Sequence, residues 1–215
     1  MTKTNKVEQN KKAWSLLAEG HYSHYRKLLV EGEYELNSIV KRELGDISGK
    51  KLLHLQCNTG ADSILLARMG AEATGVDLVP ENVHFAGMLA QELGVDDVSF
   101  VIFDIMHLMD NHEGKYNIVF TSDGVIGGYA SETKECKNFY WMYTIDGLVN
   151  SLARAGLTIE YFNGHDRCAQ GMGESVSDEE SLYDYPALPL TFSLKARVLS
   201  ITQLNSFVIV RQSVS

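Results

Sequence analysis

Lys51-Leu-Leu-His-Leu-Gln-Cys-Asn-Thr-Gly60 is the stretch that decides the fold. Its first five residues form a short apolar run, which is typical of a buried parallel strand. Asn58 and Gly60 tolerate the positive φ of a tight turn, and apolar residues then recur at helical spacing over 61–69. The pattern predicts a strand, a turn and a helix N-terminus, where unpaired N–H groups favour an electronegative part of a ligand. Alternatively, Asp62 and Ser63 only cap this helix.

Two later strands are each predicted to end in an aspartate. Residues 71–76 lead to Asp77 and residues 98–103 lead to Asp104, with a helix over 80–93 between them. Asp77 lies about twenty residues beyond the turn, where nucleotide-binding α/β folds place an acid on the ribose hydroxyls. The ends of parallel strands meet at one edge of a sheet, so the pattern predicts a pocket for a nucleotide-type cofactor. The alternative is that both aspartates are ordinary loop residues.

These features together resemble class I S-adenosylmethionine-dependent methyltransferases. The Leu53-His-Leu-Gln-Cys57 turn resembles one small-molecule subgroup of that family. The first motif of the family is an acid followed by three glycines at alternate positions, and the matching residues here are His54, Gln56, Asn58 and Gly60. Only the last glycine is retained, so the likeness also depends on Asp77, Asp104 and the later strand Ile118-Val-Phe-Thr-Ser122.

The resemblance implies a three-layer Rossmann-like methyltransferase sheet with an N-terminal helical lid, and S-adenosylmethionine as cofactor. It implies that residues 56–62 approach the methionine part, that Asp77 holds the ribose, and that Asp104 with Ile105 meets the adenine. Thr121 and Ser122 then line the reaction face. The expected cofactor-binding residues are Gln56, Cys57, Asn58, Gly60, Asp62, Asp77, Leu78, Asp104, Ile105, Thr121, Ser122, Tyr22 and Tyr25. No catalytic side chain and no metal ligand is predicted, because the methyl group of a sulfonium is already activated and mainly has to be positioned.

The N-terminal region has helical periodicity over 8–19 and 33–44, separated by an aromatic and histidine-rich stretch. His21, Tyr22 and Tyr25 in this stretch are hypothesised lid residues, because aromatic rings attract a sulfonium cation. The alternative is that they pack the two helices together. His54 is expected to be a hydrogen-bonded core residue, and Cys57 a small turn residue rather than a nucleophile.

The second half departs from the family pattern. A fourth strand is predicted over 116–120, a helix over 145–155, and strands over 157–162 and 189–197 that resemble the sixth and seventh of the family. No counterpart of the family's fifth strand is found, so the fold is expected to be shortened there. The strand-prone tail 198–210 is the candidate that fills the gap. An exposed strand edge beside the gap would favour a homodimer.

Composition sets limits on partners and location. The 215 residues are 45% hydrophobic and are expected to form one domain: a lid over 1–48, a cofactor-binding core over 49–127 and an acceptor-side part over 128–215. The net charge of −9 argues against a nucleic-acid partner. The three cysteines have no metal-ligand spacing. No signal peptide and no apolar run of membrane-spanning length is found, which predicts a cytoplasmic protein without a membrane partner.

The predicted function is methyl transfer from S-adenosylmethionine to an unidentified small-molecule acceptor. His165 and Asp166 follow the predicted strand over 157–162, where they either reach the acceptor or cap the strand end. One alternative is a catalytically inactive protein that binds the cofactor or a partner. The other is an NAD-type oxidoreductase, although residues 56–61 do not form the G-x-G-x-x-G motif of dinucleotide folds.

Overall fold

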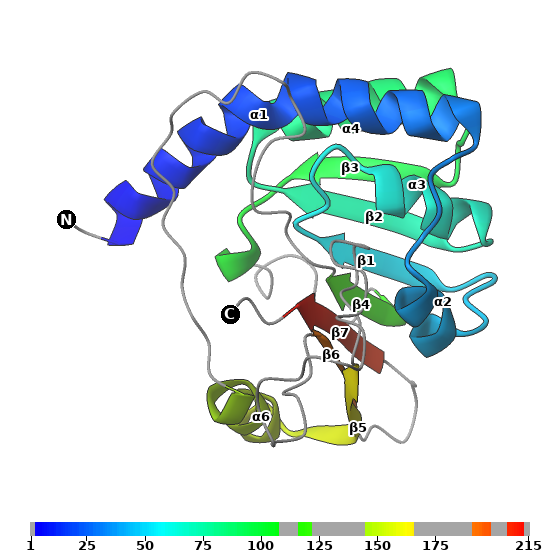
Figure 1. Ribbon diagram of the computed structural model, residues 1–215. Helices are drawn as coiled ribbons and strands as arrows, with labels where there is room; N and C mark the ends of the chain where they lie inside the picture. Colours follow the sequence, from blue (N-terminus) through cyan, green and yellow to red (C-terminus); the bar gives the residue numbers. More distant parts are fainter. Residues whose placement is uncertain (1–2, 108–115, 122–144, 166–190, 199–205, 213–215) are drawn as a thin grey trace, which may run out of the picture.

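The computed structural model describes residues 3–107, 116–121, 145–165, 191–198 and 206–212 (Figure 1). Seven strands form one sheet in the order β3-β2-β1-β4-β7-β6-β5, in which β6 is antiparallel to both neighbours and the other pairs are parallel. The strands are β1 (Lys51–Leu55), β2 (Glu72–Asp77), β3 (Val98–Ile102), β4 (Ile118–Thr121), β5 (Leu157–His165), β6 (Thr191–Val198) and β7 (Ser206–Gln212). The helices are α1 (Lys3–Glu31), α2 (Ser38–Leu44), α3 (Ala61–Arg68), α4 (Pro80–Glu92) and α6 (Ile145–Arg154), with a short 3-10 turn η1 (Ile105–His107). The predicted Rossmann-like α/β class is confirmed.

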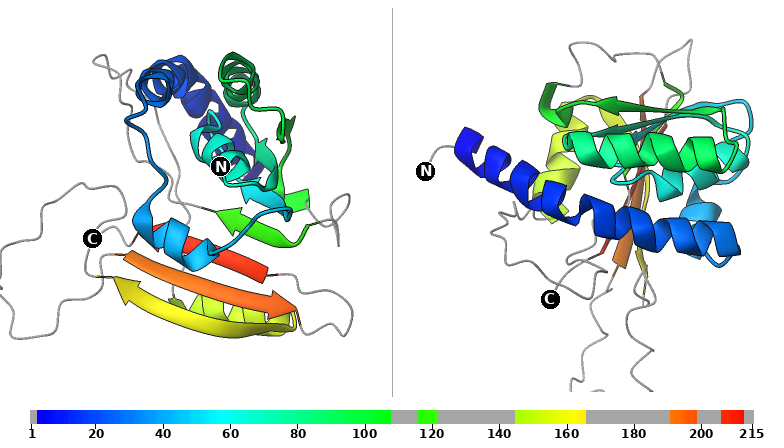
Figure 2. Two further views of the ribbon diagram at one scale, coloured as in Figure 1. Left: turned by 90° about the vertical axis from the view of Figure 1, so that its right-hand side faces the viewer. Right: turned by 90° about the horizontal axis from the view of Figure 1, so that it is seen from above.

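The helices cover the sheet in a way that follows from its connections. α3 joins β1 to β2 and α4 joins β2 to β3, and right-handed crossovers that proceed in one direction place their helices on the same face. α1 lies along α4 on that side of the molecule (Figure 2). α2 contacts β7 near the middle of the sheet, and α6 packs on β5 at the edge opposite β3.

The N-terminal region forms two helices as predicted, α1 and α2, but the break between them lies at 32–37 and not at residues 21–25. α1 runs without a break from Lys3 to Glu31. No proline lies in this range, and Gly20 alone costs only about 1 kcal/mol relative to alanine in a helix. The helix ends where Gly32 adopts a φ of 73°, a left-handed conformation that glycine accepts without strain. The aromatic stretch therefore lies on a helix, with its side chains at fixed positions.

The tail contributes a central strand. β7 is parallel to β4, with Ile118 opposite Ser206, and antiparallel to β6, with Leu194 opposite Ile209. Figure 1 shows it between these two strands. The predicted tail strand is thus confirmed, although it occupies 206–212 rather than 198–210. Because β4 is now paired on both sides, the edge that was expected to favour a homodimer does not exist.

Two apolar clusters hold the N-terminal segments on the sheet. One joins α2 to β1 and β4; its buried members include Val40, Leu44, Ile47, Leu52 and Phe120. The other joins α1 to α3 and α4; its buried members are Leu29, Ala61, Ile64, Leu89 and Ala90. Each buried leucine or isoleucine side chain contributes about 1.5–3 kcal/mol to stability. These clusters fix the first strand and the turn after it. None of the described helices combines the length and apolarity needed to cross a bilayer.

Candidate functional site

The turn after β1 is built from residues with unusual backbone angles. Gln56, Asn58 and Gly60 have φ values of 57°, 51° and 80°. The N–H of Cys57 donates to the Val76 carbonyl at 3.0 Å, and the N–H of Gly60 donates to the Cys57 carbonyl at 2.9 Å. The chain therefore doubles back tightly before α3 begins at Ala61.

Asp62 and Ser63 do not cap α3, so that alternative is wrong. The N-cap is Gly60, which has no side chain to accept a hydrogen bond. The Asp62 carboxylate instead accepts from the Tyr34 hydroxyl at 2.6 Å, and the Ser63 hydroxyl forms a 2.8 Å hydrogen bond with Nδ1 of His54. Both residues thus link α3 to other parts of the structure.

Two glycines let the turn approach the neighbouring strands closely. A Cβ atom on Gly75 would lie 2.7 Å from Cδ1 of Phe100 and 2.9 Å from Sγ of Cys57. A Cβ atom on Gly60 would lie 2.6 Å from Cζ of Phe100 and 2.8 Å from Cβ of Ala86. The Phe100 ring occupies the space that these missing side chains leave, so the position of the turn relative to β2 and β3 is fixed by packing.

Asp77 is the most constrained charged residue at this edge of the sheet. It ends β2 and is 8% exposed. Its Oδ2 accepts from the N–H of Asn58 at 2.9 Å, and its Oδ1 accepts from the N–H of Val79 at 2.9 Å and from Nδ2 of Asn82 at 3.2 Å. Burial raises the pKa of the Asp77 carboxyl above its usual value, while these hydrogen bonds act in the opposite direction. The carboxylate ties the β1 turn directly to the end of β2.

The other predicted residues lie where the sequence places them along the same edge. Asp104 follows β3 and its carbonyl accepts from the N–H of His107 at 2.9 Å, which makes Ile105 part of η1. Leu78 follows Asp77 and is half-buried, and Thr121 is the last residue of β4. Since β3, β2, β1 and β4 are adjacent and parallel, their ends bring these residues to one edge. Ser122 lies outside the described residues, as does the side chain of His165.

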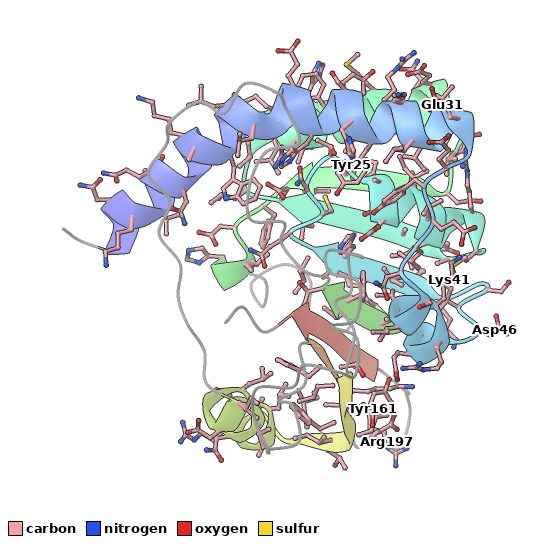
Figure 3. All side chains as sticks on the ribbon, in the orientation of Figure 1. Tyr25, Glu31, Lys41, Asp46, Tyr161 and Arg197 are labelled. Carbon is pink, nitrogen blue, oxygen red and sulfur yellow. The ribbon has the colours of Figure 1, made fainter. Side chains whose placement is uncertain are left out.

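The predicted lid residues pack α1 against the rest of the protein. The Tyr22 ring stacks on Phe85 with ring centres 4.8 Å apart, and the Tyr25 ring meets Tyr34 edge-on at 5.1 Å. Figure 3 shows Tyr25 on the side of α1 that faces the sheet. The rings thus pack α1 on α4 and on the segment that follows α1, rather than packing the two predicted N-terminal helices together, and their role as a lid stays a prediction. His21 is 1% exposed, and its Nδ1 lies 3.0 Å from Nδ2 of Asn58 in the turn.

His54 and Cys57 are buried, as the sequence predicts. Burial lowers the pKa of His54 to about 4, so its ring is neutral at physiological pH. Burial is also the main cause that raises the pKa of the Cys57 thiol, and the Asp77 carboxyl adds to it. A thiol that resists ionisation is a poor nucleophile. The interpretation of these two residues as core and turn residues is confirmed.

Two buried polar atoms beside the turn have no hydrogen-bond partner within the described part of the chain. They are Oγ1 of Thr59 and Oδ1 of Asn82. Thr59 is 1% exposed and Asn82 is 2% exposed. Sequence reasoning missed Asn82, although its spacing from Ala86, Leu89 and Ala90 places a polar side chain on the buried face of α4. The unsatisfied Asn82 oxygen beside Asp77 suits a ligand that brings a hydroxyl or amine donor.

Comparison with known proteins identifies the class. Residues 46–184, more than half of the chain, match a family described as Methyltransferase domain. The chain belongs to this family, whose cofactor is S-adenosylmethionine. The Asp77 carboxylate at the end of β2 and the unpartnered oxygens of Thr59 and Asn82 can accept hydrogen bonds, which fits the hydroxyl and amine donors of that cofactor. Within the described residues, no group of three or more histidine, cysteine, aspartate or glutamate side chains is arranged to hold a metal ion.

Several individual proteins are similar to parts of the chain. Ubiquinone biosynthesis O-methyltransferase from Pectobacterium atrosepticum is 36% identical over 98 residues, which are 42% of this chain and 40% of that protein. The enzyme of that name from Psychrobacter arcticus is 33% identical over 78 residues, 36% of this chain and 30% of that protein. An uncharacterized RNA methyltransferase from Caldanaerobacter subterraneus is 27% identical over 108 residues, 50% of this chain and 24% of that protein. The chain thus spans less than half of the length of these relatives.

Solved structures show partial similarity. A DhpI complex with S-adenosylhomocysteine has a TM-score of 0.42 at 21% identity, covering 57% of this chain and 55% of that one. A TehB-like S-adenosylmethionine-dependent methyltransferase from Corynebacterium glutamicum has a TM-score of 0.38 at 18% identity, covering 48% and 53%.

Proposed function

We propose that the protein transfers a methyl group from S-adenosylmethionine to a small-molecule acceptor. The observation that carries the proposal is Asp77, a buried carboxylate at the end of β2 that accepts from the N–H of Asn58 in the turn after β1. This contact joins the two segments that the family uses for the methionine and ribose parts of the cofactor. The family match over 46–184 supports the same activity.

The cofactor, when bound, supplies a methyl group that its sulfonium has already activated. The task left to the chain is to hold the methyl group and the acceptor in line and to exclude water, which accounts for much of the rate increase in such displacements. The turn from Gln56 to Gly60 orients the methionine part, and Leu78 and Ile105 flank the adenine. A general base is needed only for an acceptor that must lose a proton. The proposal therefore assigns positioning roles and no base.

A small molecule is the proposed acceptor class. The chain is acidic, with a net charge of −9, and a nucleic-acid substrate requires neutralisation of many phosphates. Relatives named as ubiquinone biosynthesis O-methyltransferases support a small acceptor, whereas one relative is named as an RNA methyltransferase. A direct test supplies the protein with S-adenosylmethionine carrying a radioactive methyl group, together with small-molecule or RNA fractions. Label in small molecules supports the proposal, and label in RNA alone contradicts it.

We further infer that β7 takes the place of the family's fifth strand, which this shortened chain lacks. Support comes from the position of β7, parallel to β4 and antiparallel to β6. Because β7 fills the position between β4 and β6, the sheet gives no support there to the alternative of an inactive protein.

Calorimetric titration with S-adenosylhomocysteine tests the cofactor site. Asp77→Ala removes the carboxylate and is expected to weaken binding by about 10- to 100-fold, since hydrogen bonds to charged groups contribute about 1.5–3 kcal/mol. Asp96→Ala, an exposed aspartate between α4 and β3, is the matched control and is expected to bind like the wild type. Circular dichroism checks that all three proteins are folded. A folded wild-type protein that binds no S-adenosylhomocysteine would falsify the proposal.

A further inference from the structure

Asn82 is a polar residue on the buried face of α4, where its neighbours are apolar. It lies in the first turn of the helix, is 2% exposed, and shares the buried face with Ala86 and Leu89. Its Nδ2 donates to Oδ1 of Asp77 at 3.2 Å, but its Oδ1 has no partner among the described residues. Turning the amide over would place two acceptor oxygens against each other, so the ionised Asp77 fixes its orientation. Asn82 therefore holds an unused acceptor beside the Asp77 carboxylate.

The Asp77 carboxylate has few acceptor sites left for a ligand. A carboxylate offers about four lone-pair sites, two on each oxygen. On Oδ1, both sites are used by the N–H of Val79 and the amide of Asn82. On Oδ2, one site is used by the N–H of Asn58. Asp77 can thus accept from at most one hydroxyl of a ribose, and a ribose diol presents two donors.

We propose that Asn82 completes the ribose site: its Oδ1 accepts from one ribose hydroxyl of the cofactor while Oδ2 of Asp77 accepts from the other. This inference rests on the proposed function and adds a cofactor-specificity residue to it. The Asn82 amide then has two roles, because Nδ2 orients the carboxylate and Oδ1 takes the hydroxyl that the carboxylate cannot. Asp77 is 8% exposed and Asn82 2% exposed, so the proposal requires a local rearrangement that makes both accessible to the ribose.

Titration with S-adenosylhomocysteine and its 2′-deoxy and 3′-deoxy analogues tests the inference. For the wild type, loss of the hydroxyl that pairs with Asn82 is expected to weaken binding by about 3- to 10-fold, the effect of one neutral hydrogen bond. Asn82→Leu is similar in size and removes the acceptor, and Asn82→Ala is a second variant should leucine fit poorly. In both variants the affinities for S-adenosylhomocysteine and for that one analogue are expected to differ by less than about twofold. The affinity for the other deoxy analogue is expected to remain below that for S-adenosylhomocysteine by the same factor as in the wild type.

The control variant and the outcomes separate a ligand contact from a structural role. Gln91→Leu changes an exposed amide on the same helix and is expected to keep the wild-type ratios. If Asn82 only orients Asp77, the wild type is expected to lose affinity for only one of the two deoxy analogues, because Asp77 accepts from at most one hydroxyl, and this result overturns the inference but not the proposed function. A folded wild-type protein that binds none of the three ligands overturns both.

Discussion

Removal of β7 is expected to abolish cooperative folding of the sheet. β7 is paired with β4 at four positions and with β6 at seven, and about one backbone N–H or C=O group per paired position faces it. If roughly half of these groups stay buried without a partner, each costs about 1–3 kcal/mol, and the free energy of unfolding falls by about 5–15 kcal/mol. The whole stability of a typical domain lies in the same range. A chain that ends at Asn205 is therefore expected to unfold.

Urea titration followed by circular dichroism measures this effect. The matched control ends at Gln212, so that it keeps all of β7 and removes only the three residues beyond it. The control is expected to unfold within about 0.5 kcal/mol of the full chain. The shorter chain is expected to show no cooperative transition. If it unfolds cooperatively within about 1 kcal/mol of the full chain, β7 is not an integral strand and the reasoning is refuted.

Two further predictions concern buried residues. Gly75→Ala places a Cβ atom 2.7 Å from the Phe100 ring and is expected to lower the free energy of unfolding in urea by about 1–3 kcal/mol. The control Gly87→Ala has open space around it on α4 and is expected to be neutral or stabilising by up to about 1 kcal/mol. Equal effects of the two variants would contradict the packing argument. Burial lowers the pKa of His54 to about 4 in the folded state, whereas the pKa of an unfolded histidine is about 6.5. The contribution of the neutral His54 ring to stability is therefore present above pH 6.5 and is lost as the pH falls towards 4. The expected loss between pH 7 and pH 5 is about 2 kcal/mol, and it is expected to disappear in His54→Gln; an unchanged pH profile in that variant would assign the effect to other groups.

Much of the segment from β1 to β3 was predictable because each element has its own local signal. Apolar runs indicated the buried strands, Pro80 and Gly94 marked the ends of α4, and the acids at 77 and 104 followed strand ends. The parallel arrangement then brings these ends together whatever the details of packing. The shared edge of the sheet was therefore predicted correctly, while the contact of each residue with the cofactor stays a prediction.

Other features depend on contacts between distant parts of the chain. The aromatic composition of the stretch from His21 to Tyr25 suggests a break between helices, yet none of its residues removes a helical hydrogen bond and α1 continues through it. The link between Asn58 and Asp77 joins residues 19 positions apart, and no local pattern indicates it. Asn82 could have been noticed as a polar residue at buried helical spacing, but its unsatisfied oxygen is visible only in three dimensions.

The position of β7 also bears on the order in which the protein folds. β1 to β3 with α3 and α4 form from segments close in sequence, whereas β7 pairs with a strand whose first residue, Ile118, lies 88 positions before its own first residue, Ser206. Closing so long a loop is entropically costly, and such contacts slow folding. Among the described strands, β7 alone is hydrogen-bonded to both β4 and β6, so it links the part of the sheet formed by β1 to β4 to the pair formed by β5 and β6. We therefore expect the sheet to become continuous only at a late step, before which the edges of β4 and β6 are exposed to pairing with other chains.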